Sequence, residues 1–353
     1  MKIFQCQNCG LAVYFENTVC ERCGSRLGFL PDTAVLSALT DNGEGTWRPL
    51  GGEGAVQRFC ANADHEVCNW LVPAGSPSPF CVACAPNRTI PDLSEQQNLQ
   101  RWRKLEAAKR RLVYSLLRLG LPIQSKSEGV ATGLAFELIA DTDPDAPVLT
   151  GHADGLITIN IAEADDAERE ARRSAMGEPY RTLLGHFRHE VGHYYWDRLV
   201  RDAGLVDAFR AIFGDETRDY SEALSAHYAN GPQPDWQARY VSAYASSHPW
   251  EDFSETWAHY LHIVDALETA DAFGLQTRPG VADSGTLTHI ITFDPYSEVP
   301  FTRIIDAWLP LTYAVNSLNR SIGQPDFYPF VLARPAIDKL EFVHRLGHGE
   351  LQG

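Results

Sequence analysis

The sequence predicts an α+β protein in which a cysteine-rich N-terminal part precedes a mostly helical domain with a small sheet. Three observations lead to this prediction. All eight cysteines lie within the first 84 residues. Beyond residue 163, apolar residues recur mainly at helical spacing. The chain has 353 residues, 44% of them hydrophobic, so it can bury at least one sizeable core, and we expect two or three domains.

The first four cysteines form two close pairs with ten residues between them. Cys6 and Cys9 make one C-x2-C knuckle, and Cys20 and Cys23 make the other. Two knuckles at this spacing bring four thiolates onto one tetrahedral Zn²⁺ ion, which is the arrangement of a zinc ribbon. We therefore predict a zinc-ribbon module over residues 1–30.

The other four cysteines form a looser set, with seven, twelve and two intervening residues. We predict a second structural zinc site over residues 31–92, with His65 as the alternative ligand and with four thiolates from Cys60, Cys68, Cys81 and Cys84. Disulfides are the other interpretation of eight cysteines. Paired knuckles, and a first stretch Met1-Lys2-Ile3-Phe4 that is not an apolar signal segment, favour reduced thiols and a cytoplasmic location.

Charge and hydropathy argue against two classes of partner. Residues 1–90 carry six Lys and Arg against eight Asp and Glu, and the whole chain has a net charge of −16, so a basic surface for nucleic acid is not expected. No run approaches the roughly 20 apolar residues of a membrane helix. We expect the zinc ribbons to contact a protein partner or to stabilise their own fold, and to unfold when zinc is removed.

Residues 93–122 read as a basic amphipathic helix that connects the zinc modules to the rest of the chain. Its leucines form an apolar stripe, and seven cations crowd the same stretch: Arg101, Arg103, Lys104, Lys109, Arg110, Arg111 and Arg118. Such a helix is also typical of membrane-surface or nucleic-acid binding. We favour docking of the apolar stripe on the body of the protein, with the cations facing acidic groups.

Residues 134–161 read as strands around a turn, and the β-branched run 156–161 is predicted to be an edge strand that could pair with an extended peptide. Helices are expected afterwards at about 163–200 with a break at 177–179, and at 219–229, 236–246, 250–270, 301–320 and from 335 onward.

Residues 189–193 read His-Glu-Val-Gly-His, which is the HExxH pattern. On a helix, this spacing places His189 and His193 one turn apart on one face as two ligands for zinc, with Glu190 beside them as a candidate general base. A chance match on an exposed helix is the alternative. Apolar residues at helical spacing around the motif indicate a buried helix, in which His and Glu need partners, and a metal ion is the partner we expect.

The order of these features resembles a bacterial family of zinc-binding metallopeptidases with an N-terminal zinc-ribbon region. The resemblance spans nearly the whole chain and rests on the cysteine clusters, the basic helix and the segments TGHADGLITINIAEAD, GHFRHEVGHYYW and SSHPWEDFSETWAHYLHIVDAL. It implies that residues 123–353 form a gluzincin-like catalytic domain with a zincin-like fold.

The resemblance also implies the rest of the site. Gluzincins complete their zinc site with a glutamate on a second helix, and the segment from Glu251 to Glu255 resembles their pattern. By this resemblance Glu251 is the third ligand and Glu255 orients a ligand histidine, although the reverse assignment stays open. Tyr244 is similar in position to a phenol that some gluzincins place near the metal to stabilise an oxyanion.

The function we predict is that of a zinc-dependent hydrolase, a protease that cleaves peptide or protein substrates, with one catalytic and two structural Zn²⁺ ions. Zinc would lower the pKa of a water toward about 7, and Glu190 would take its proton and pass it to the leaving amine. The alternatives are an interaction scaffold with a catalytically idle peptidase-like domain, and a hydrolase of non-peptide amides.

Overall fold

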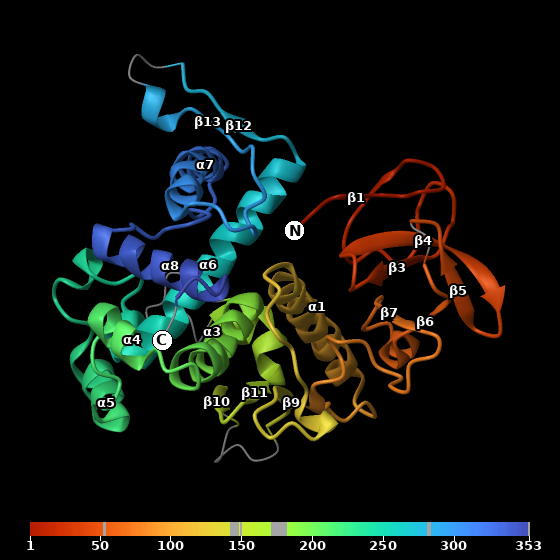
Figure 1. Ribbon diagram of the computed structural model, residues 1–353, viewed down its shortest axis with the longest axis horizontal. Coiled ribbons are helices and arrows are strands. Elements are labelled where there is room, and N and C mark those ends of the chain that lie inside the picture. The colour runs from red at the N-terminus through yellow and green to blue at the C-terminus, as the bar shows by residue number, and fades with distance from the viewer. Residues whose placement is uncertain (52–53, 142–147, 149, 171–181, 281–283, 352–353) are drawn as a thin grey trace. The chain divides into compact units, whose positions relative to one another are not determined.

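The computed structural model describes residues 1–51, 54–141, 148, 150–170, 182–280 and 284–351. The chain divides into two compact units, Met1–Phe187 and Arg188–Gly353, and the boundary falls inside helix α3 (Leu183–Tyr195). Each unit is described by itself (Figure 1).

The first unit begins with two small β structures. Strands β1 (Phe4–Gln5) and β2 (Ala12–Val13) form a hairpin around the first cysteine pair. A five-stranded antiparallel sheet follows, in the order β3-β4-β5-β6-β7, with strands Leu27–Leu30, Val35–Gly43, Thr46–Pro49, Gln57–Phe59 and Leu71–Pro73. A single parallel bridge links Phe29 of β3 to Trp70, the residue just before β7. This sheet was not predicted from the sequence.

One hydrophobic core joins both cysteine clusters to this sheet. Phe15, Phe29, Trp70 and Tyr114 pack ring against ring within it, and the distance between the ring centroids of Phe29 and Trp70 is 4.7 Å. Cysteines of both clusters belong to the same core. The N-terminal fold therefore depends on aromatic packing as well as on the two sets of thiols.

Helix α1 (Gln96–Arg118) confirms the predicted basic amphipathic helix. Its apolar stripe, which includes Trp102, Leu105 and Leu112, is fully buried. Its cations face carboxylates as expected. Arg101 Nη2 lies 2.5 Å from Asp165 Oδ2. Two further ion pairs are Arg103 with Glu66 and Arg111 with Glu16. Lys109 is itself fully buried against Glu106, at 2.7 Å.

The second sheet of this unit has the order β10-β11-β9-β8, with strands Gly151–Ala153, Leu156–Asn160, Ala135–Ile139 and Asn87–Thr89. The predicted edge position of residues 156–161 is wrong. Strand β11 lies between β10 and β9, because the turn at positions 154–155 folds residues 151–153 back on it as a short antiparallel strand. Most of its backbone is therefore already paired.

The second unit is helical around α6 (Pro249–Ala272), which contacts α4, α7 and α8 (Figure 1). Helix α3 continues into a π-helical segment, Trp196–Arg201. The remaining helices are α4 (Val206–Phe213), α5 (Tyr220–Asn230), α7 (Phe301–Ser321) and α8 (Arg334–Gly347), and the short strands β12 (Gln276–Thr277) and β13 (His289–Ile290) pair with each other. Short 3-10 segments lie at Ala61–His65, Lys126–Glu128, Ile161–Ala164, Trp236–Ala238, Tyr244–Ser246 and Ser284–Leu287.

These elements confirm the predicted class, an N-terminal zinc-ribbon region followed by a mostly helical domain with small sheets. The predicted helix at 236–246 is wrong, since it contains two 3-10 turns instead. The predicted break at 177–179 lies outside the described residues. Among the helices that are described, none has the length and apolar character needed to cross a bilayer. The domain boundaries after residues 30, 92 and 122 stay a prediction.

A buried ion pair joins α6 and α8, and removal of its cation alone is expected to be strongly destabilising. Lys339 Nζ lies 2.6 Å from Asp252 Oδ2, and the two side chains are 8% and 0% exposed. Replacing Lys339 by Met leaves a buried carboxylate without its cation, which costs about 3–5 kcal/mol. Urea unfolding should show this loss for Lys339→Met. The double variant with Asp252→Asn should recover most of it, and a double variant no more stable than Lys339→Met would contradict the pairing.

A buried histidine on α8 should make the protein less stable in acid. His344 donates from Nε2 to the Val299 carbonyl and accepts from the Tyr260 hydroxyl at Nδ1, at 2.8 and 3.0 Å. Burial lowers its pKa to about 4. The unfolded chain therefore binds a proton that the folded chain excludes, and stability present above pH 6.5 is lost as the pH falls. When the pH falls from 7 to 5, wild type should therefore lose about 1–2 kcal/mol more unfolding free energy than His344→Gln, as measured by urea unfolding.

Candidate metal centre and zinc-ribbon sites

Helices α3 and α6 approach closely where the HExxH pattern lies. Gly192 makes this possible, because a Cβ at this position would meet Ser254 Oγ at 2.9 Å and Trp257 Cβ at 3.2 Å. His189 and His193 are one turn apart on the same face of α3, and Glu251 is in the first turn of α6. The close helix packing brings these three side chains together.

The geometry of the three side chains is compact. His189 Nε2 lies 3.0 Å from Glu251 Oε2, and His193 Nε2 lies 3.6 Å from Glu251 Oε1. All three ligand atoms lie within 4.8 Å of one another. His193 and Glu251 are buried, at 3% and 1% exposure. Such a set of buried, converging nitrogen and oxygen atoms is typical of a metal centre.

The spacing fits zinc. Zn–N and Zn–O bonds of about 2.1 Å at a tetrahedral angle place neighbouring ligand atoms about 3.4 Å apart, between the two distances observed here. The pKa shifts of the same side chains also agree with a bound cation at this site. Burial lowers the pKa of His189, but Glu251 and Glu255 outweigh it and raise the pKa well above its usual range. Burial raises the pKa of Glu251, but the two histidines outweigh it and hold the pKa well below normal.

Glu255 contacts the other nitrogen of His189. His189 Nδ1–H donates to Glu255 Oε1 at 2.8 Å, which leaves Nε2 directed at Glu251. The Ser242 hydroxyl donates to Glu255 Oε2 at 2.5 Å and accepts from the amide of Ala245 at 3.1 Å. Sequence analysis missed Ser242. Its contact with Glu255 depends on tertiary packing, and no spacing in the sequence indicates it.

Glu190 lies beside the two histidines and is 9% exposed. Burial is the main cause that raises the pKa of its carboxyl, and the charges of His189 and His193 partly oppose it. Within the described part of the chain, its carboxylate accepts no hydrogen bond. A buried carboxylate with a raised pKa and unused acceptor sites is suited to accept a proton.

Two tyrosines border the centre. The ring of Tyr244 lies 5.9 Å from that of His189, and burial raises the pKa of its phenol, which keeps the hydroxyl protonated. Tyr220, on α5, donates its hydroxyl to Glu251 Oε1 at 2.6 Å. Sequence analysis missed Tyr220. Asp219 caps the start of its helix by accepting from the Glu222 amide, a pattern readable in the sequence, but nothing there indicates the contact with Glu251.

The first cysteine cluster has the spacing of a zinc–thiolate site. Cys6 Sγ lies 3.7 Å from Cys23 Sγ, and Cys9 Sγ lies 3.5 Å from Cys20 Sγ. Zn–S bonds of about 2.3 Å at a tetrahedral angle place sulfurs about 3.8 Å apart, whereas a disulfide needs about 2.05 Å. The cluster therefore fits a tetrahedral zinc ion.

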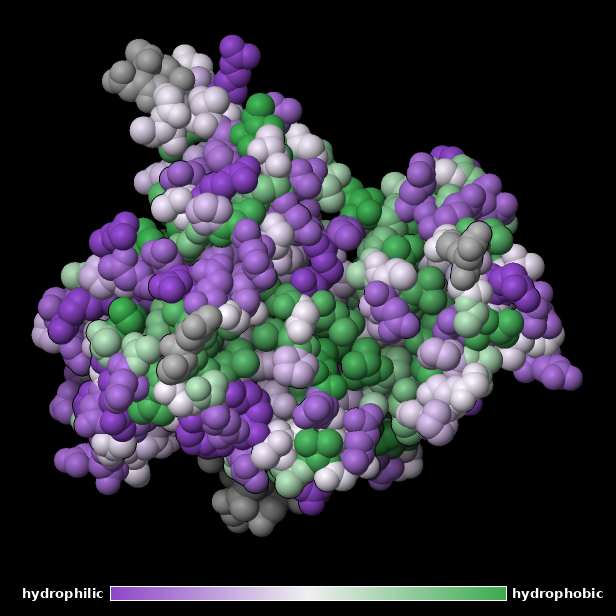
Figure 2. All heavy atoms as spheres, in the orientation of Figure 1, coloured by the Kyte–Doolittle hydropathy of each residue, from purple (hydrophilic) through white to green (hydrophobic). Residues whose placement is uncertain are grey.

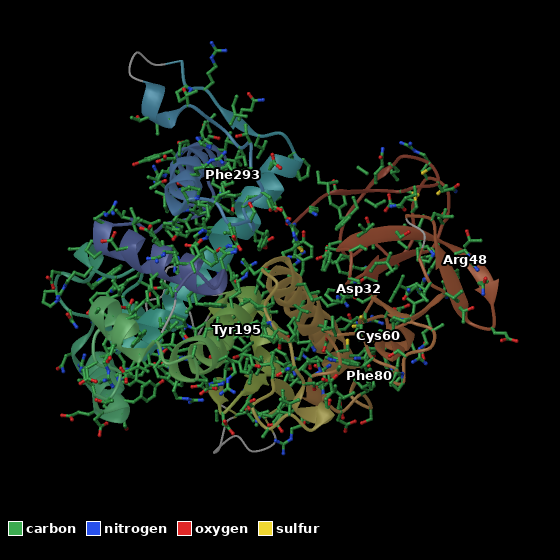
Figure 3. The ribbon with its side chains drawn as sticks, viewed as in Figure 1. Asp32, Arg48, Cys60, Phe80, Tyr195 and Phe293 are labelled. Atoms are coloured by element: carbon green, nitrogen blue, oxygen red, sulfur yellow. The ribbon has the colours of Figure 1, made fainter. Side chains whose placement is uncertain are left out.

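The second cluster consists of four buried thiols, and Figure 3 labels Cys60. Cys68 Sγ lies 3.8 Å from Cys81 Sγ, again the zinc–thiolate spacing. Backbone amides of Trp70 and Cys81 donate to the sulfurs of Cys68 and Cys60, each at 3.4 Å, which favours thiolates. His65 lies outside this set, with its ring against Trp102. All eight cysteines are free of disulfides.

The fold and these sites define the class of the protein: an N-terminal zinc-ribbon region with two four-cysteine clusters, followed by a mostly helical domain with a His-His-Glu cluster. Two family models match it, a "zinc-ribbon domain" over residues 3–95 and a "Putative zinc-binding metallo-peptidase" over residues 98–346. The chain belongs to this zinc-binding metallopeptidase family.

Mycobacterial proteins are similar over almost the entire chain. Uncharacterized protein Mb2598c of Mycobacterium bovis and Uncharacterized protein Rv2568c of Mycobacterium tuberculosis are each 41% identical over 345 residues, covering 98% of this chain and 94% of their own. No solved structure gives a significant match.

Proposed function

We propose that this protein is a zinc-dependent peptidase with an HExxH, gluzincin-like centre, which holds one catalytic zinc ion in addition to two structural ones. The convergence of His189, His193 and Glu251 within 4.8 Å is the observation that carries the proposal. These three residues would hold the ion, and Glu255 would accept a hydrogen bond from the other ring nitrogen of His189. The family to which the chain belongs supports the same reaction class.

Zinc, when bound, polarises a substrate carbonyl and lowers the pKa of a water toward about 7. Glu190 acts as the general base, since its unused carboxylate can take the proton of the attacking water. The same carboxyl group then donates this proton to the nitrogen of the leaving amine. Burial raises the pKa of Glu190, which makes its carboxylate a stronger base toward the attacking water.

The other polar groups orient the ligand histidine and bind the reacting carbonyl oxygen. Glu255, fixed by Ser242, holds His189 in the tautomer whose Nε2 faces Glu251. We assign Glu251 as the third ligand because both of its oxygens face the histidines, whereas Glu255 faces His189 Nδ1. The Tyr244 hydroxyl, kept protonated by burial, is the proposed donor to the oxyanion of the tetrahedral intermediate.

A digest of a diverse peptide library by the zinc-loaded protein, read by mass spectrometry, tests the proposal. We expect cleavage at preferred sequences that stops when zinc is removed and returns when it is added back. A protein that holds three zinc ions and cleaves no peptide would instead favour a non-peptide amide as substrate or an interaction scaffold. The cytoplasmic location and a protein partner for the zinc ribbons stay predictions.

A further inference from the structure

Helix α5 has little packing of its own. None of its 11 residues is buried. Hydrophilic residues make up most of the surface in its region (Figure 2). A helix this short is marginally stable by itself in water, because few hydrogen bonds follow the costly first turn. Its position therefore depends on a small number of side-chain contacts.

The side chains of α5 itself make their contacts at the candidate metal centre, while the Arg210–Glu216 pair and a hydrogen bond from His248 to the Arg218 carbonyl hold the turn before it. The Tyr220 hydroxyl donates to Glu251 at 2.6 Å, and its ring centroid lies 5.3 Å from that of His248 and 5.7 Å from that of Trp250. Further along α5, the ring of His227 lies 6.0 Å from that of Tyr244. The start of α5 therefore lies directly against Glu251, the proposed third ligand.

Glycines flank the segment that carries α5. Gly214 ends α4 with φ 100° and ψ −170°, and Gly231 follows α5 with φ 76° and ψ −179°. These backbone angles are open to essentially glycine alone. A few such positions can absorb the dihedral changes of a hinge. Asp219 caps α5 locally, so the helix can keep its form while the flanking glycines turn.

We propose that α5 is a lid over the candidate metal centre and that the Tyr220 hydroxyl latches it to Glu251. The inference rests on the proposed function, because Glu251 is the proposed third ligand. A peptide that enters the centre breaks the latch, the segment turns about Gly214 and Gly231, and α5 closes over the peptide.

Hydrogen exchange of the zinc-loaded full chain tests the latch. In Tyr220→Phe, which removes only the hydroxyl, the amides of α5 should exchange about tenfold faster or more than in wild type, while those of α6 stay unchanged and report an intact fold. The matched control is Tyr228→Phe, on the same helix, whose side chain is 63% exposed and which should match wild type. Equal α5 exchange in Tyr220→Phe and wild type would overturn the proposal.

A dipeptide hydroxamate, which binds zinc through its two oxygens, tests closure in the wild type. We expect its binding, measured by calorimetry, to slow exchange in α5 about tenfold. Hydroxamate binding that leaves α5 exchange unchanged would rule out a lid while supporting the zinc centre. Failure to bind hydroxamate at all would count against the proposed function, and the Tyr220→Phe comparison would still decide the latch.

Discussion

Glu190→Gln is expected to keep all three zinc ions and lose about 10²–10⁴-fold in turnover. Gln has nearly the shape of Glu, so α3 and its two histidines should be undisturbed. The amide cannot accept a proton from water or return it to the leaving amine. Turnover is measured on a peptide that the wild-type protein cleaves, and zinc content on the same sample.

The matched control for this variant is Glu298→Gln, which makes the same change at an exposed carboxylate. It should have wild-type turnover and zinc content. If Glu190→Gln kept full turnover, the general base would have to be another residue. If it lost zinc together with activity, Glu190 would have a structural role in the centre.

Cys81→Ser is expected to reduce the zinc content from three ions to two and to destabilise the N-terminal zinc-ribbon region strongly. Cys81 is 3% exposed and belongs to the core that contains Trp70 and Tyr114. Apparent binding energies of structural zinc reach roughly 10–16 kcal/mol in small domains, which is more than such a fold gains from packing alone. Faster hydrogen exchange in β3 to β7 and a lower melting temperature would report the loss.

Asp64→Asn is the control for this prediction, because Asp64 is exposed and lies between the cluster residues Cys60 and Cys68. It should change stability by no more than about 0.5 kcal/mol. A Cys81→Ser protein that keeps three zinc ions and wild-type exchange would show that the second cluster binds no structural zinc.

The parts of the fold that sequence predicted best have strong local signals. The apolar stripe of α1 and the apolar face of α6 recur at helical spacing, and both helices lie within a few residues of their predicted bounds. The paired cysteines are also a strong local signal, because a C-x2-C spacing places both thiols on the same side of a tight turn. The HExxH spacing likewise predicted that His189 and His193 lie together, whereas Glu251 was predicted only from the resemblance to gluzincins.

The features that were predicted wrongly or not at all have two causes. Side-chain hydrogen bonds compete with backbone ones, and some contacts join residues that are far apart in the sequence. In the predicted helix 236–246, Ser242 accepts from the Ala245 amide and Ser246 donates to the Ala243 carbonyl, so serine hydroxyls replace the backbone partners of a helix. The strand at 156–161 became central because a short return strand covers it. Tyr220 meets Glu251 across 31 positions, a contact set by packing and not by local pattern.

The most direct test of the proposed catalytic zinc centre is a count of zinc ions per chain by native mass spectrometry, in wild type and in His193→Ala. We expect three ions in wild type and two in the variant, with both proteins folded. Two ions in each would contradict it, because the His-His-Glu cluster would then hold no zinc and could not support the proposed peptidase.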